Sequence, residues 1–110
     1  MPKQPTELLK GTLDLLILRT LELEPRHGVS IADRIAQITR GTFQVKPGSL
    51  FPALHRLEQN GHLKGEWSTT EEGRRAKVYR LTPAGARQLE VEKRQWSRIV
   101  MAIGQVLESD

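Results

Sequence analysis

The sequence predicts one mainly α-helical domain with a small β-hairpin. Three observations support this fold class. Apolar side chains recur at helical spacing in four stretches, residues alternate with period two between positions 63 and 81, and glycine, proline and threonine mark the ends of these stretches. With 110 residues, 37% of them hydrophobic and 27% charged, the chain can bury one modest core and is too short for two catalytic lobes.

The composition argues against several classes of protein. The chain has no cysteine, so it cannot form disulfides or thiolate metal sites, and nothing argues for secretion. Asp14 and Arg19 interrupt the apolar run of residues 8–23, which therefore lacks the uncharged length of a membrane span. We expect a cytoplasmic protein without membrane insertion, metal or cofactor. Its formal charge of +4 is compatible with an anionic partner.

The first helix is predicted over residues 7–23, after a flexible tail at residues 1–5 and an N-cap at Thr6. It is apolar over most of its circumference and so needs cover on more than one side. Because one small domain cannot supply this cover alone, we infer a partner surface, most simply a second copy of the chain. The alternative is that the helix is simply the central core helix of the domain.

A second helix is predicted over residues 30–39, after a turn at residues 24–28. Ile31, Ile35 and Ile38 form its inward face, and Gly41 ends it. Residues 42–45 alternate and are rich in β-formers, which predicts a short strand or an extended link.

A short exposed helix is predicted within residues 45–61, and we expect the rest of the chain to be organised around it. Pro47 suits the first helical position, and Leu50, Leu54 and Leu57 recur at helical spacing. Pro52 removes a backbone hydrogen bond, so we expect an irregular first turn. The order of these three helices is that of a helix-turn-helix whose third element faces outward.

The other face of this third helix is polar and lacks the Glu/Lys ladder of an ordinary solvated helix. Its small N-terminal residues would let a phosphate approach the free amides and the positive dipole end, and its longer side chains could reach base edges. An amphipathic helix with an accidental polar face is the alternative. The residues predicted here to bind DNA are Lys46, Gly48, Ser49, His55, Arg56 and Gln59.

A β-hairpin is predicted from strands at residues 63–68 and 77–81, with a charged tip at residues 71–75. Because a two-stranded ribbon is unstable alone, we expect Leu63, Trp67, Tyr79 and Leu81 to pack on the helices, with Trp67 as a core anchor rather than a ligand contact. The basic residues of this region could neutralise phosphates, although each alone could be ordinary solvated surface. They are Lys64, Arg74, Arg75 and Lys77.

The last helix is predicted from Pro83, with Thr82 as N-cap, to about residue 107. Its apolar side chains recur every seven residues, as in a short coiled-coil seam. Together with the apolar first helix, this pattern predicts a homodimer built from both ends of the chain. The predicted dimer contacts are Leu9, Leu13, Leu16, Leu89, Trp96, Ile99, Val100 and Ile103.

This order of elements is that of a winged helix-turn-helix, and four motifs resemble the PadR family of transcriptional regulators. They lie at residues 13–18, 27–35, 47–58 and 79–85, and the resemblance extends from about residue 8 to residue 107. The chain departs from the family pattern at Val29 and Ser30, and at Phe51, where tyrosine is usual. We therefore expect Phe51 to be a packing residue. Lys46 stands where a hydroxyl residue often caps the helix.

The resemblance implies a winged helix-turn-helix DNA-binding domain at residues 6–82 and a dimerisation helix at residues 83–110. It also implies a homodimer on an inverted-repeat operator, with each recognition helix in a major groove and each wing on the flanking backbone. Members commonly act as repressors released by small, often aromatic, molecules, and some bind planar ligands between tryptophans at the dimer centre. Trp96 is thus a candidate effector contact, with a plain coiled-coil contact as the alternative.

The predicted function is sequence-specific binding of double-stranded DNA as a transcriptional repressor. A winged-helix module that binds protein or oligomerises without reading DNA is the alternative. We do not expect an enzyme, because His27, His55 and His62 lie on different elements without ligand-like spacing, and Ser49 lacks the flanking residues of a nucleophile elbow.

Overall fold

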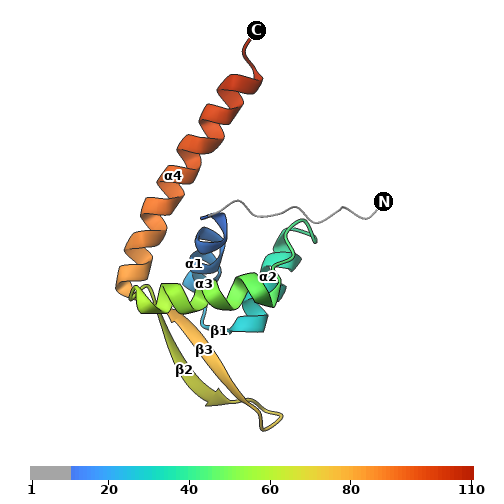
Figure 1. Ribbon diagram of the computed structural model, residues 1–110, viewed down its shortest axis with the longest axis vertical. Helices are drawn as coiled ribbons and strands as arrows, with labels where there is room; N and C mark the ends of the chain where they lie inside the picture. Colours follow the sequence, from blue (N-terminus) through green and yellow to red (C-terminus); the bar gives the residue numbers. More distant parts are fainter. Residues whose placement is uncertain (1–10) are drawn as a thin grey trace.

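The computed structural model describes residues 11–110 and consists of helices with a small antiparallel sheet (Figure 1). Three helices form the body, a hairpin projects from one side of it, and a long C-terminal helix extends away. This arrangement is the predicted winged helix-turn-helix. The elements are α1 Thr12–Leu23, β1 Arg26–His27, α2 Gly28–Ile38, α3 Pro47–Gln59, β2 Leu63–Thr69, β3 Arg75–Leu81 and α4 Pro83–Leu107.

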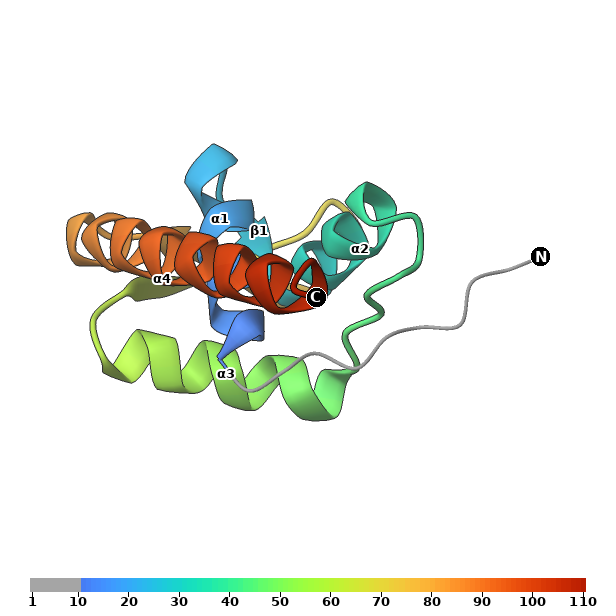
Figure 2. The same ribbon diagram turned by 90° about the horizontal axis from the view of Figure 1, so that it is seen from above.

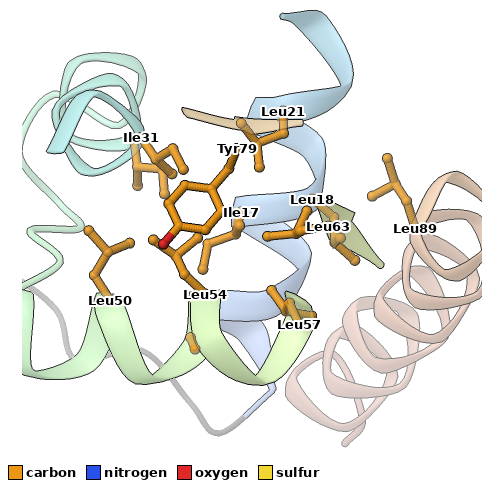
Figure 3. Packing of buried hydrophobic residues seen from close by; sticks show 12 residues of the cluster. Ile17, Leu18, Leu21, Ile31, Leu50, Leu54, Leu57, Leu63, Tyr79 and Leu89 are labelled. Atoms are coloured by element: carbon orange, nitrogen blue, oxygen red, sulfur yellow. The ribbon is translucent and has the colours of Figure 1, made fainter. Parts of the chain in front are cut away.

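Helix α1 is the centre of the hydrophobic core. Ile17 and Leu18 are fully buried, and leucines of α3, β2 and α4 surround them (Figure 3). Thr20 is a buried polar residue, and its hydroxyl donates a hydrogen bond to the Leu16 carbonyl at 2.7 Å. The buried hydroxyl therefore has a hydrogen-bond partner within the core. Helix α1 is therefore a core helix of this chain, while its Leu13, Leu15 and Leu16 are only partly buried against that core. The part of the predicted helix before residue 11, with Thr6 and Leu9, lies outside the described residues.

The segment between α1 and α2 differs from the prediction. Residues 24–28 were expected to form only a turn, but Arg26 and His27 form β1, which pairs antiparallel with Val78 and Tyr79 of β3. Helix α2 begins directly afterwards, two residues earlier than predicted. Residues 42–45 form no strand and provide the extended link that was the other expectation for them.

Helix α3 begins at Pro47, as predicted, and buries one narrow face consisting of Leu50, Ala53, Leu54 and Leu57. The expected irregular first turn is not found. Leu50 N–H donates to the Lys46 carbonyl at 2.9 Å, and the helix continues through Pro52. The carbonyl that lacks a partner because of Pro52 belongs to residue 48, which is exposed and can bind water instead.

The hairpin packs on the helices with its inner half only. Leu63 and Tyr79 are buried, and Leu81 packs against the core. Trp67 is 62% exposed, so its predicted role as a core anchor is wrong. The paired strands run outward from Leu63 opposite Leu81 to Thr69 opposite Arg75. The outer end of this ribbon extends beyond the helices (Figure 1).

Helix α4 begins at a tightly packed junction. Thr82 Oγ1 accepts a hydrogen bond from Gly85 N–H at 2.9 Å, which confirms the predicted N-cap, and donates one to the Gly61 carbonyl at 2.6 Å. A Cβ atom at Gly85 would lie 2.0 Å from the His62 carbonyl oxygen. The helix is thus fixed at its start, and its distal half extends away from the body (Figure 1).

Candidate nucleic-acid interface

Helix α3 runs along one side of the molecule (Figure 2), and its outward face is polar and exposed. Lys46, Gly48, Ser49, His55 and Gln59 are all exposed on it, while the opposite face lies in the core. Lys46 is the N-cap residue, and its side chain makes no capping hydrogen bond. Pro47 has no N–H, and the Ser49 and Leu50 N–H groups both donate to the Lys46 carbonyl, so the amide of this first turn that is left for an anion is that of Gly48, at the positive end of the helix dipole.

Arg56 is held by α1. Its Nη1 donates to Asp14 Oδ2 at 2.6 Å and its Nη2 donates to Asp14 Oδ1 at 2.9 Å. This paired geometry is the main reason why the pKa of Arg56 is raised, and the nearby Glu92 carboxylate on α4 adds to it. Although Arg56 was predicted to bind DNA, the structure engages both of its terminal nitrogens within the fold.

Glu58 joins α3 to the hairpin. Its carboxylate accepts a hydrogen bond from Lys77 Nζ at 2.7 Å and another from Gly65 N–H at 3.2 Å. The lysine and the backbone donor together lower the pKa of Glu58, and the same contact raises the pKa of Lys77. These bonds set the position of the wing relative to the outer face of α3.

The predicted phosphate contacts fall into two groups. Lys77 is paired with Glu58, and Lys64 lies 3.5 Å from Glu66 in an exposed pair that stabilises the fold little. Within residues 11–110, Lys46, Arg74 and Arg75 form no ion pair, so their full charge is available to a partner.

Trp67 is a surface residue that the sequence did not assign to the interface. The Arg75 guanidinium lies 5.2 Å from the centroid of its ring, and Lys77 Nζ lies 6.0 Å from it. Period-two alternation placed Trp67 correctly on the same side of the ribbon as Leu63. It could not show that the ribbon continues past the helices.

The distal half of α4 exposes a continuous apolar strip. Trp96 is 39% exposed, and Ile99, Val100 and Ile103 are more exposed still. Such a strip is larger than the scattered apolar residues of an ordinary monomer surface. Trp96 does not line the open hollow that Gln95, Arg98, Ile99 and Ala102 form nearby.

The other predicted dimer contacts are placed differently. Leu89 is 0% exposed in the chain's own core and has no side-chain surface to offer a partner. It lies in the first part of α4, which packs against the body of the domain. Leu13 and Leu16 are partly buried against the same core, and Leu9 precedes the described residues.

No group of three or more His, Cys, Asp or Glu side chains in the described part of the chain could hold a metal ion. Within the same part, no helix has the length and hydropathy needed to span a membrane.

Comparison with known proteins agrees with this geometry. Residues 17–91 match the transcriptional regulator PadR-like family. The transcriptional regulator Rv3488 of Mycobacterium tuberculosis is 43% identical over 88 residues, which cover 80% of this chain and 78% of that protein.

Solved structures agree as well. A PadR family transcriptional regulator from Eggerthella lenta superposes with a TM-score of 0.80 at 31% identity, covering 92% of this chain and 86% of its own. A PadR family transcription regulator from Clostridium difficile gives a TM-score of 0.76 at 33% identity, covering 88% and 99%. Members of this family are transcriptional regulators rather than enzymes, which confirms the expectation from the sequence. The chain therefore belongs to the PadR-like family of transcriptional regulators and has its winged-helix fold.

Proposed function

We propose that the protein is a transcriptional repressor that binds an inverted-repeat operator as a homodimer, with α3 of each chain in a major groove. The observation that carries this proposal is the division of α3 into a buried apolar face and an exposed face of small, hydrogen-bonding and cationic residues. A helix of this kind fits the major groove, where base edges present distinct donors and acceptors.

The contacts along α3 follow from where its side chains lie. The Gly48 amide, at the positive end of the helix dipole, would bind a phosphate, and Lys46 would add its charge. His55, Gln59 and Ser49 would read or approach base edges. We assign Arg56 a positioning role, because Asp14 already accepts hydrogen bonds from both of its terminal nitrogens.

The hairpin would lie on the backbone that flanks the groove. Arg74 and Arg75 are its unpaired cations within residues 11–110, and Lys64 stands on the same ribbon. Contacts of this kind give affinity for any sequence and a steep dependence on salt. The Glu58 and Lys77 pair would keep the wing at a fixed distance from the recognition helix.

The exposed strip on α4 supports the homodimer. Trp96, Ile99 and Ile103 share one face at spacings of three and four residues, so a second α4 could cover them. A two-fold dimer presents two recognition helices related by symmetry, and such an arrangement binds an inverted repeat.

A small aromatic effector completes the proposal. Trp96 offers a half-exposed indole, and two copies across the dimer axis would form a stacking site for a planar ligand. Quenching of Trp96 emission by a planar aromatic compound, together with release of bound DNA, would support this role. No quenching of Trp96 emission, measured in a Trp67→Phe chain, would leave Trp96 as a coiled-coil contact.

A fluorescence-anisotropy titration tests the proposal. The labelled duplex is the DNA upstream of the chain's own gene, compared with a scrambled duplex at two salt concentrations. We expect tighter binding to the upstream duplex, saturation at two chains per duplex, and weaker binding to both at the higher salt. Equal, weak binding to both duplexes would favour the alternative function, a winged-helix module that binds protein.

A further inference from the structure

The outer half of the hairpin holds an aromatic side chain that contributes little to the fold. Trp67 lies beyond the helices on β2, 62% exposed, while the residues that anchor the ribbon, Leu63 and Tyr79, are buried. Indole is a large apolar group, and 62% exposure leaves most of it in water. The core therefore does not explain this residue.

Two cationic side chains lie near the exposed Trp67 ring, on the same face of the ribbon. Lys77 lies opposite Trp67 in the register, and Arg75 is the next residue of β3 on that face. Both are within cation–π range, at 6.0 Å and 5.2 Å from the ring centroid to Lys77 Nζ and Arg75 Cζ. Lys77 also lies 5.6 Å from the Tyr79 ring, so aromatic and cationic groups alternate from the core to the hairpin tip.

The two cations differ in what they can offer a partner. Lys77 is already neutralised by Glu58 at 2.7 Å. Arg75 forms no ion pair with residues 11–110 and lies against the Trp67 ring, which restricts its side chain without neutralising its charge. A guanidinium held in this way loses less conformational entropy when it binds a phosphate.

We propose that Trp67 is a DNA-contacting residue: its indole packs against the deoxyribose of the strand that flanks the major groove and directs Arg75 to an adjacent phosphate. The proposal rests on the DNA-binding function above and adds a residue to it. Trp67 is on the same side of the ribbon as the Glu58 contact that joins α3 to the wing, so the backbone of a duplex read by α3 would run past it. An exposed indole beside an unpaired guanidinium is complementary to the DNA backbone, because the indole can pack on the apolar deoxyribose while the guanidinium binds the neighbouring phosphate.

The first test measures duplex affinity for four variants by anisotropy. Trp67→Ala is expected to weaken binding to upstream and scrambled duplexes alike, on the order of tenfold, and Trp67→Phe by less. Arg75→Gln is expected to weaken binding to both duplexes by a similar factor. It should also lower the dependence of affinity on salt by the amount that corresponds to about one phosphate contact. Ser68→Ala, on the opposite face of the same strand, is the matched control and should bind like the wild type.

The second test uses tryptophan emission, which a purely structural role would not change. Trp96→Phe leaves Trp67 as the single tryptophan, and Trp67→Phe leaves Trp96. Adding saturating duplex should quench and shift the emission of Trp67 and leave that of Trp96 unchanged.

The outcomes separate this inference from the proposed function. If the wild type binds duplex selectively but Trp67→Ala binds as tightly and the Trp67 emission does not change, the inference is overturned and the repressor proposal stands. If the wild type does not bind duplex at all, the proposed function fails first. Trp67→Ala should keep the wild-type melting temperature, because the side chain lies outside the core.

Discussion

Arg56 and Asp14 form a bidentate ion pair between α3 and α1, although 42 positions separate them in the sequence. The Asp14 side chain is 15% exposed and the Arg56 side chain 53% exposed, so the acid lies at the edge of the core and the base reaches down to it. The pair fixes the third helix of the helix-turn-helix on the helix that forms its core.

The pair predicts that Asp14→Asn weakens specific DNA binding, although Asp14 lies on α1, outside the proposed DNA-binding face of α3. Asparagine removes the charge that holds Arg56, and α3 loses part of its orientation. We expect a loss of stability of about 1 kcal/mol or less, because Arg56 is half exposed. Arg56→Gln should reduce affinity for the operator about as much as Asp14→Asn. For both variants, fluorescence anisotropy measures the affinity for the operator and thermal unfolding measures the stability.

A different result would reassign Arg56. If Arg56 reads a base directly, Asp14→Asn should leave binding intact or tighten it, while Arg56→Gln alone should weaken it.

Two glutamates are expected to respond in opposite directions to the same substitution. The pKa of Glu58 is lowered by Lys77 and Gly65, so its ion pair stabilises the fold above the ordinary glutamate pKa, and this contribution is lost as the pH falls through the folded-state pKa. The pKa of Glu92 is raised by burial, so the fold favours its neutral form and pays a penalty as the pH rises.

Glu58→Gln should therefore lower the melting temperature near pH 7, and Glu92→Gln should raise it. The Glu92 difference should fade first as the pH falls, because the pKa of Glu92 is raised, and the Glu58 difference should fade only below the ordinary glutamate pKa, because the pKa of Glu58 is lowered. Thermal unfolding across this range provides the comparison, and each variant controls for the other. Shifts of the same sign at neutral pH would show that the two environments have been assigned wrongly.

Gly85→Ala is expected to destabilise the junction between the α3–β2 turn and α4. Its Cβ would meet the His62 carbonyl oxygen at 2.0 Å and Leu81 Cδ1 at 2.7 Å, and the backbone oxygen cannot move away without shifting the turn. We expect a loss of about 2 kcal/mol or more in chemical denaturation. Gly104→Ala on the same helix is the control, since its Cβ would meet nothing within 4 Å and it should be neutral or stabilising.

The apolar strip on α4 predicts that Ile103→Asp prevents dimerisation. An aspartate there would place an unpaired charge where the partner helix is expected to pack. Light scattering after size exclusion should show a dimer for the wild type and a monomer for the variant. Gln105→Asp, on the opposite side of the helix, should remain dimeric. An Ile103→Asp chain that stays dimeric would place the interface elsewhere.

Local signals in the sequence account for much of the fold. Thr82 and Pro83 mark the start of α4, Pro47 marks the start of α3, and the alternation on both sides of the tip gives the hairpin. These features depend on neighbours within a few residues. Strand β1 could not be predicted in this way, because its two residues become a strand only by pairing with Val78 and Tyr79, far along the chain.

The candidate interface was predictable only in part, for the same reason. Period and residue type located the exposed face of α3 and the basic hairpin. The partners of Arg56 and Lys77 lie 42 and 19 positions away, so the sequence could not show that the fold engages both cations. Trp67 was assigned to the core because alternation gives the face of a strand and not the extent of the helices beneath it.

The measurement that tests the central claim most directly is the DNA selectivity of a chain with His55→Ala and Gln59→Ala. Both residues are exposed on α3 and outside its core contacts, so the variant should fold normally. We predict that it loses the preference for the upstream duplex, at about 1–3 kcal/mol for each lost base contact, and keeps the wild-type affinity for scrambled DNA. A variant that still discriminates between the two duplexes as the wild type does would contradict the assignment of α3 as the reading helix.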